Sequence, residues 1–271
     1  MSRDPNPNVG SEARFDAGLE ADHGQVRTEV EDQLLLIAID RPAHRNAFTP
    51  RMLQQLAQAF TRLEDDPTLH AGVLHGIGGH FTSGFDHAAL QTLLQRGEPL
   101  FATGLVDPAE QGSSNWRSRS KPVIAAVTGE VGEWGMALML AADVAIAADD
   151  CRFQCSFHGS FLPSQTTQNE ARPDVLVAGS SVQCIIRSTV RRVAQRAGQA
   201  HALAYLLAGS HLNSEEALQR NLVHKVVRNS HVLDTALRMA YATARQPQHA
   251  VAAIRAEALR AWRTDGAARL K

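Results

Sequence analysis

Residues 121–148 constrain the fold more than any other stretch of this chain, because they place a glycine-punctuated helix between two short apolar runs. "KPVIAAV" has the composition of a buried strand, "GMALMLAA" that of a buried helix, and "DVAIAA" that of a second strand. Two buried strands joined through a helix favour parallel pairing, since parallel strands need a long crossover connection. The stretch therefore predicts an α/β fold with parallel strands.

The same alternation of strand and helix begins earlier in the chain. Residues 25–42 contain two strand-like runs around the acidic turn "EDQ" and predict a hairpin. Residues 49–66 predict a helix with Thr49 as its N-cap and Pro50 in its first turn. Its apolar residues recur at helical spacing and form one stripe: Met52, Leu53, Leu56, Phe60 and Leu63.

Four further segments complete the expected organisation. Residues 1–24 are polar and lack periodicity, which predicts a mobile N-terminal tail. Residues 97–120 lack a stable period and are full of breakers, which predicts a long surface excursion. We expect residues 25–205 to form the core and residues 206–271 to form a mostly helical C-terminal region, used for oligomerisation.

Composition excludes several classes of function. A chain of 271 residues with 44% hydrophobic residues can bury a large core, and a net charge of −1 argues against nucleic acid or an anionic membrane as the main partner. No apolar run approaches the roughly 20 residues of a membrane span, and no signal-peptide pattern follows Met1. The three cysteines favour a reducing cytoplasm, and Cys151 with Cys155 makes a poor metal site, so no metal is expected.

Four ordered stretches resemble the enoyl-CoA hydratase/isomerase (crotonase) superfamily. They are "IDRPAHRNAFTPRMLQQL", "VLHGIGGHFTSGFDHAAL", "KPVIAAVTGEVGEWGMALMLAADVAIAADDCRF" and "LLAGSHLNSEEALQRNLVHKVV". The resemblance implies an α/β spiral of ββα units with a C-terminal helical part, assembled as a homotrimer or a dimer of trimers. It also implies an acyl-CoA thioester as substrate, with coenzyme A as part of that substrate and no permanently bound cofactor.

The resemblance also implies an oxyanion hole, made of two backbone N–H groups that hold the thioester oxygen while it gains negative charge. The first donor would be the N–H of Phe85. The second would be the N–H of Trp134, which stands where the family has a glycine, so the indole would crowd the thioester. The residues implied for binding the CoA part are Arg45, Ala47, Ser83 and Gly84.

Both glutamates that hydratases of this family use are absent. Ala137 stands at the first position and Phe157 at the second, and neither side chain can exchange a proton. Glu133 and His158 are the foremost substitutes for the missing acid or base, with Glu130 and His87 as further candidates. The alternative for each of these residues is a solvated or capping role at the surface.

Residues 158–188 do not fit the family pattern. They are either a true insertion, with the strand-like runs "DVLVAG" and "VQCIIRS", or the product of a local reading-frame alteration.

The leading hypothesis is an acyl-CoA-binding enzyme of the hydratase/isomerase kind that stabilises a thioester enolate. The alternatives are a catalytically impaired homologue acting as an acyl-CoA-binding or structural subunit, a thioester hydrolase or decarboxylase with a substitute acid, and an unrelated α/β protein.

Overall fold

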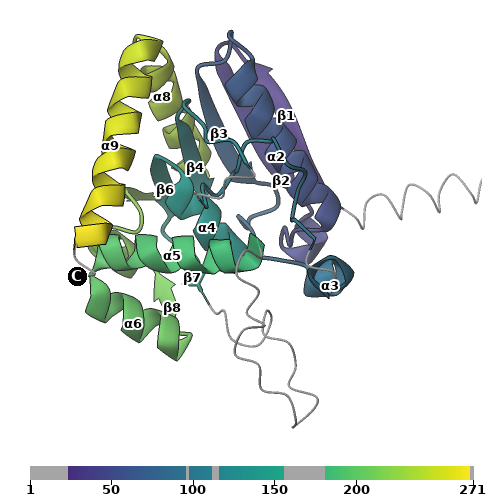
Figure 1. The fold of residues 1–271 in the computed structure, drawn as a ribbon, viewed down its shortest axis with the longest axis vertical. Helices are drawn as coiled ribbons and strands as arrows, with labels where there is room; N and C mark the ends of the chain where they lie inside the picture. The colour runs from purple at the N-terminus through teal and green to yellow at the C-terminus, as the bar shows by residue number, and fades with distance from the viewer. Residues whose placement is uncertain (1–23, 96–97, 112–115, 156–180, 269–271) are drawn as a thin grey trace, which may run out of the picture.

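The computed structural model describes residues 24–95, 98–111, 116–155 and 181–268 (Figure 1). The predicted tail 1–24, apart from Gly24, and the run "DVLVAG" lie outside these ranges. Among the described residues, no helix combines the length and the apolar character that crossing a membrane requires.

A six-stranded sheet in the order β1-β2-β3-β4-β6-β9 forms the centre of the molecule. The antiparallel hairpin β1–β2 is confirmed, and every other neighbouring pair in the sheet is parallel, as the crossover helices require. The strands are β1 Gln25–Glu31, β2 Leu34–Asp40, β3 Ala71–Gly76, β4 Val123–Val127, β6 Val144–Ala148 and β9 Lys225–Val227.

A second, three-stranded sheet has the order β5-β7-β8 and lies beside the start of helix α4. Its strands are β5 Glu130–Val131, β7 Arg152–Gln154 and β8 His211–Asn213. Both β8 and β9 lie beyond residue 205, and β9 is an edge strand of the main sheet, so this region supplies strands as well as helices.

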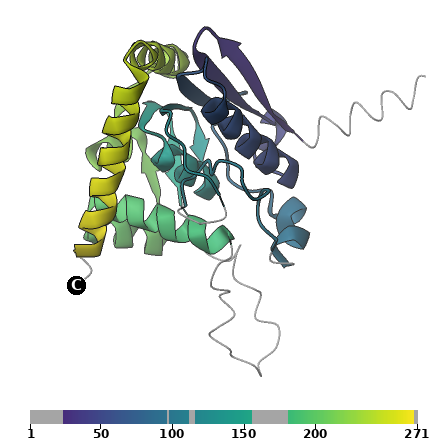
Figure 2. The ribbon, with the colours of Figure 1, turned by 45° about the horizontal axis from the view of Figure 1, so that its top comes forward.

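The helices cover the main sheet from several directions (Figures 1 and 2). Helix α2 packs against β1 and β2, whereas α8 packs against β2, β3, β4 and β6. The helices are α2 Pro50–Asp65, α3 His87–Gln95, α4 Glu133–Ala141, α5 Ser181–Ala197, α6 Gln199–Ala208, α7 Ser214–Gln219, α8 Val232–Ala244 and α9 Gln248–Ala268, with 3₁₀ turns η1 Pro42–His44 and η3 Asn229–His231.

The predicted helix over residues 49–66 is confirmed as α2. Thr49 Oγ1 accepts a hydrogen bond from the Met52 N–H at 3.3 Å, which satisfies one of the donors exposed at the helix start. The whole predicted apolar stripe is buried against the sheet, from Met52 to Leu63. Capping and periodicity therefore agree with the tertiary contacts here.

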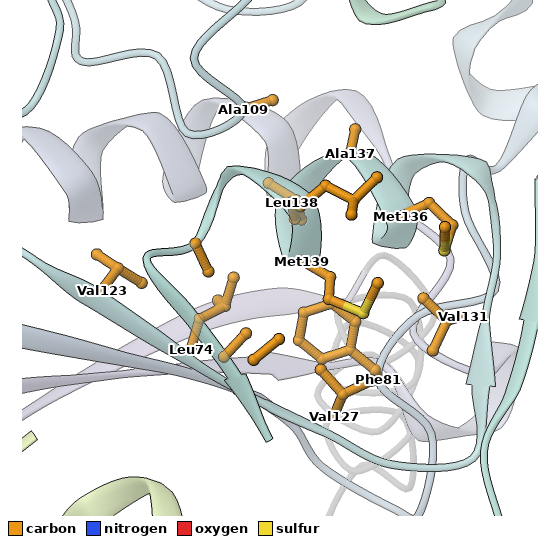
Figure 3. Close-up of a cluster of buried hydrophobic side chains, with 14 of the residues drawn as sticks. Leu74, Phe81, Ala109, Val123, Val127, Val131, Met136, Ala137, Leu138 and Met139 are labelled. Atoms are coloured by element: carbon orange, nitrogen blue, oxygen red, sulfur yellow. The ribbon is translucent and has the colours of Figure 1, made fainter. Parts of the chain in front are cut away.

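Helix α4 lies in the middle of the core, and all of its residues are buried. Figure 3 shows Met139 pointing from α4 toward Phe81 and Val127, while Ala137 points to the side on which Ala109 lies. A helix that is apolar on every side must be covered on every side. The sheet covers one side, and α5 together with the loop before β4 covers others.

The expectation of a surface excursion over residues 97–120 was wrong. Five apolar residues of this loop are buried, and the rings of Phe101 and Trp116 lie 4.4 Å apart. The sequence concealed this packing because contacts made by an irregular loop have no period. The buried residues are Leu100, Phe101, Val106, Ala109 and Trp116.

A buried cluster of charges fixes this loop to the C-terminal helices. Arg119 Nη1 lies 2.5 Å from Asp143 Oδ2, and its Nε lies 3.4 Å from Glu110 Oε1. Arg255 of α9 pairs with both acids, and Arg192 of α5 donates to the carbonyl of Ala109 at 2.7 Å. Each buried charge therefore faces an opposite charge or a carbonyl, as burial requires.

The strand-like interpretation of "VQCIIRS" was also wrong, because these residues belong to α5. Ile185, Thr189 and Val193 are buried at a spacing of four, which is the spacing of one helix face. The β-branched residues of the run suggested a strand, but packing against α4 and α6 decides the outcome.

Candidate functional site

Two backbone segments meet where the sequence placed the oxyanion hole. Thr82 and Val131 pair in a parallel bridge, and the Gly132 N–H donates to the Thr82 carbonyl at 2.8 Å. A Cβ atom on Gly132 would lie 2.0 Å from the Ser83 carbonyl oxygen, so this approach requires glycine. The start of α4 thus lies directly against the turn that precedes α3.

The Phe85 N–H lies within that turn and is already engaged. It donates to Glu133 Oε1 at 3.3 Å. Gly84 has φ of +115°, and a Cβ atom there would lie 2.7 Å from the Glu133 carboxylate. The Phe48 N–H donates to the Gly84 carbonyl at 2.9 Å and holds the turn in place. The first expected donor therefore faces an acid of α4.

Trp134 is the second residue of α4, so the helix begins earlier than the glycine pattern suggested. The N–H of Met136 makes the first hydrogen bond of the helix, to the Gly132 carbonyl at 2.8 Å. The Trp134 N–H precedes it and belongs to the donors that a helix leaves unused at its start. The sequence predicted a helix from Gly135 onward, and the structure shows that it begins at Glu133.

The indole of Trp134 is fully buried. Its ring stacks on Phe85 with centroids 5.2 Å apart at 29°, and it meets Phe48 edge-on at 6.2 Å and 80°. Its Nε1 atom has no hydrogen-bond partner among the described residues. The side chain packs as part of the core, beneath the turn that carries Phe85.

Glu133 and His87 lie together at the same place. His87 Nε2 lies 3.4 Å from Glu133 Oε1, and the two side chains are 42% and 12% exposed. The hydrogen bond to Glu133 raises the pKa of the His87 imidazole above its ordinary value, with a smaller contribution from Asp86. Sequence reasoning named both residues, but only the fold places them in one pair.

Ala137, which the resemblance places at the first missing acid, is completely buried. Phe157 and His158 lie outside the described residues, so the site is described without them.

A small polar cavity of about 200 Å³ borders both segments. Two of the four residues implied for CoA binding line it, Arg45 and Ser83. Arg45 Nη1 lies 3.0 Å from both carboxylate oxygens of Glu130, which also lines the cavity. Ala47 and Gly84 are outside the lining. The other lining residues are Val131, Gly132, Arg152, Gln154 and His211.

Sequence reasoning missed three polar residues of this cavity: Arg152, Gln154 and His211. Arg152 and Gln154 lie on β7, and His211 pairs opposite Gln154 on the neighbouring strand β8. Alternation along β7, with Phe153 buried between two exposed residues, was the available signal for the first two. His211 could be placed only by the pairing of β7 with β8.

Burial keeps two cysteines near this site unreactive, and the charge of Glu133 also acts on the Cys155 thiol. Cys151 and Cys155 are unpaired and buried, and burial raises the pKa of the Cys151 thiol to about 12 and that of Cys155 still further. Both thiols therefore stay protonated at neutral pH. Within the described ranges, no three His, Cys, Asp or Glu side chains are arranged to hold a metal ion.

Comparison with known proteins identifies relatives over most of the chain. Enoyl-CoA hydratase EchA19 of Mycobacterium tuberculosis is 28% identical over 221 residues, which cover 81% of this chain and 74% of EchA19. Probable enoyl-CoA hydratase EchA14 of the same species is 36% identical over 144 residues, which are 51% of this chain and 52% of EchA14. This chain thus spans about half the length of EchA14.

Solved structures show the same architecture. The crystal structure of a probable enoyl-CoA hydratase/isomerase from Mycobacterium abscessus superposes with a TM-score of 0.71 at 30% identity, covering 88% of this chain and 82% of that one. The enoyl-CoA hydratase/isomerase family profile matches residues 29–166, just over half of the chain. The chain therefore belongs to the enoyl-CoA hydratase/isomerase family, and its α/β fold is that of the crotonase superfamily.

Proposed function

We propose that the protein binds an acyl-CoA thioester and stabilises its enolate between the N–H groups of Phe85 and Trp134. This proposal rests on the direct backbone contact between the two segments that carry the donors. Thr82 of the first segment pairs with Val131 of the second, and Ser83 lies against Gly132. Preorganised backbone donors at a helix start favour a developing oxyanion, and the dipole of α4 adds to that effect. Buried aromatic rings below the donors keep the site dry.

The CoA part of the substrate would pass Arg45, Ala47, Ser83 and Gly84. The polar cavity beside Arg45 and Ser83 supports this placement, since a CoA phosphate needs cationic partners. Phosphate binding would compete with the Arg45–Glu130 ion pair, which lies at the exposed rim of the cavity.

Proton transfer in this site needs a group other than Ala137. Glu133 is the candidate that touches a proposed oxyanion donor, and His158 remains a prediction outside the described residues. Because Glu133 now occupies the Phe85 N–H, its carboxylate must leave before a thioester oxygen can bind there. The reaction is of the hydratase or isomerase kind on this proposal.

A homotrimer or a dimer of trimers is proposed as the assembly. Exposed apolar side chains on α6 and α9 support an interface there, since Leu207 and Ile254 are each 71% exposed.

The proposal is tested first by binding. Melting temperatures are measured with a panel of acyl-CoA thioesters, and a ligand at about 100 times its Kd adds roughly 2.7 kcal/mol to the unfolding free energy. Hydration of crotonyl-CoA is then followed with the wild type, Glu133→Gln and His158→Ala. Strong hydration that survives both substitutions contradicts the assignment of the acid.

Two observations favour a second candidate function, a subunit that binds acyl-CoA without turnover. The buried Ala137 and the occupied Phe85 N–H both point to lost catalysis. Stabilisation by acyl-CoA without any hydration would select this candidate, and absence of stabilisation by every thioester would contradict both functions.

A further inference from the structure

One oxygen of Glu133 faces two partners at once. Oε1 accepts the Phe85 N–H at 3.3 Å and lies 3.4 Å from His87 Nε2. A thioester oxygen entering the hole must take the Phe85 N–H from this carboxylate, because the single N–H hydrogen is already donated to Oε1. His87 is the partner that the carboxylate can keep when it moves.

Solvent exposure increases along this pair. The Glu133 side chain is 12% exposed and Gly84 closes one side of it, whereas the His87 side chain is 42% exposed. When His87 is protonated, it therefore places a cation on the solvent side of the shielded carboxylate.

On the basis of the proposed function, we infer that Glu133 is the catalytic base of this site and that His87 is its positioning residue. In the step, the Cα–H bond of the acyl group breaks and an O–H bond forms on Glu133. The electron pair of the broken bond moves into the enolate, whose oxygen the Phe85 N–H holds. His87, as the imidazolium, keeps the carboxylate beside the hole, and Glu133 gives the proton up to water through the exposed part of its own side chain.

The charges around His87 suit this role. Glu133 faces it from α4, and Asp86 precedes it in the chain, so both acids favour the imidazolium. Arg41 Nη1 holds Asp86 at 2.8 Å, which leaves Glu133 as the dominant partner of His87. The imidazolium holds the carboxylate more strongly than neutral imidazole does, so the pair functions in its charged form.

The experiment measures exchange of the α-hydrogens of butyryl-CoA for deuterium in D₂O by NMR, using the full chain. The variants are Glu133→Gln and His87→Gln, with His201→Gln as a control on the exposed surface of α6. We expect Glu133→Gln to slow exchange by about 10²- to 10⁴-fold, the usual contribution of a positioned base. All variants should keep the stabilisation by butyryl-CoA.

Two further readouts separate positioning from a structural role of His87. In the wild type the exchange rate should fall as the pH rises through the raised pKa of His87. His87→Gln should abolish this pH dependence and slow exchange about tenfold or more. In NMR titrations without any ligand, Glu133→Gln should lower the pKa of His87 toward its ordinary value.

Four results overturn the inference. A wild type that binds butyryl-CoA without exchange, or a His87→Gln variant with the rate and pH profile of the wild type, contradicts the pair alone. Absence of stabilisation by any thioester contradicts the proposed function, and the pair with it. A pKa of His87 that is unchanged in Glu133→Gln contradicts the pair independently of activity.

Discussion

Truncation of the Trp134 side chain tests the packing beneath the proposed hole. The indole is completely buried, stacks on Phe85 and meets Phe48 edge-on, so Trp134→Ala leaves a cavity between two rings. Loss of a buried Trp side chain costs about 3–5 kcal/mol of unfolding free energy. For a chain of this size, that corresponds to a decrease in melting temperature of roughly 6–20 °C.

Trp134→Phe is the matched control. It keeps an aromatic ring between the neighbours and removes the buried Nε1–H, for which the described residues offer no acceptor. A buried donor without a partner costs about 1–3 kcal/mol, and its removal offsets part of the packing lost with the smaller ring. We expect Trp134→Phe to cost less than about 1.5 kcal/mol.

For both variants, the unfolding free energy is measured with denaturant and the melting temperature by heating. The increase in melting temperature with an acyl-CoA is then measured. The backbone N–H at position 134 remains in each, so folded protein should still bind the thioester. A cost below about 1 kcal/mol for Trp134→Ala would show that the indole is not a core residue. A cost of Trp134→Phe well above about 1.5 kcal/mol would show that Nε1 does have a partner.

Three further predictions concern backbone strain, buried charge and pH. Gly84→Ala should lower the unfolding free energy by about 1–3 kcal/mol, because φ is +115° and the added Cβ meets Glu133. Thermal melts of the double variant with Glu133→Ala should recover the part due to this clash, whereas the part due to backbone strain should remain. Glu110→Gln should cost about 3–5 kcal/mol in denaturant unfolding, because it leaves Arg119 and Arg255 short of one negative partner. Burial lowers the pKa of His224 from 6.5. The stability that its neutral form contributes is therefore present above about pH 6.5 and is lost as the pH falls through the lowered pKa. His224→Gln should flatten this part of the curve of unfolding free energy against pH, and an unchanged curve would contradict the assignment.

The pattern of the sequence predicted the main elements because their signals are local. Alternation of apolar runs and a capped helix gave the hairpin, α2 and the buried strands on either side of α4. The family resemblance implied that Phe85 and the start of α4 would form one site, and the structure brings these segments into contact. Their role as oxyanion donors stays a proposal.

The rest depended on contacts between residues far apart in the chain. The loop over residues 97–120 is packed inward by aperiodic apolar residues, and α5 contains a β-branched run that alone resembles a strand. Glu133 and His87 are 46 positions apart, so no local period relates them, and His211 reaches the cavity only through the pairing of β8 with β7.

The sequence by itself determined the α/β class, the family resemblance and the absence of acids at Ala137 and Phe157. These properties depend on residue type and order, which a sequence states directly. The tertiary structure decided that the Trp134 indole packs into the core and that the Glu133 carboxylate occupies the Phe85 N–H. Side-chain direction in a crowded core is set by the neighbours on all sides, and those neighbours come from distant segments.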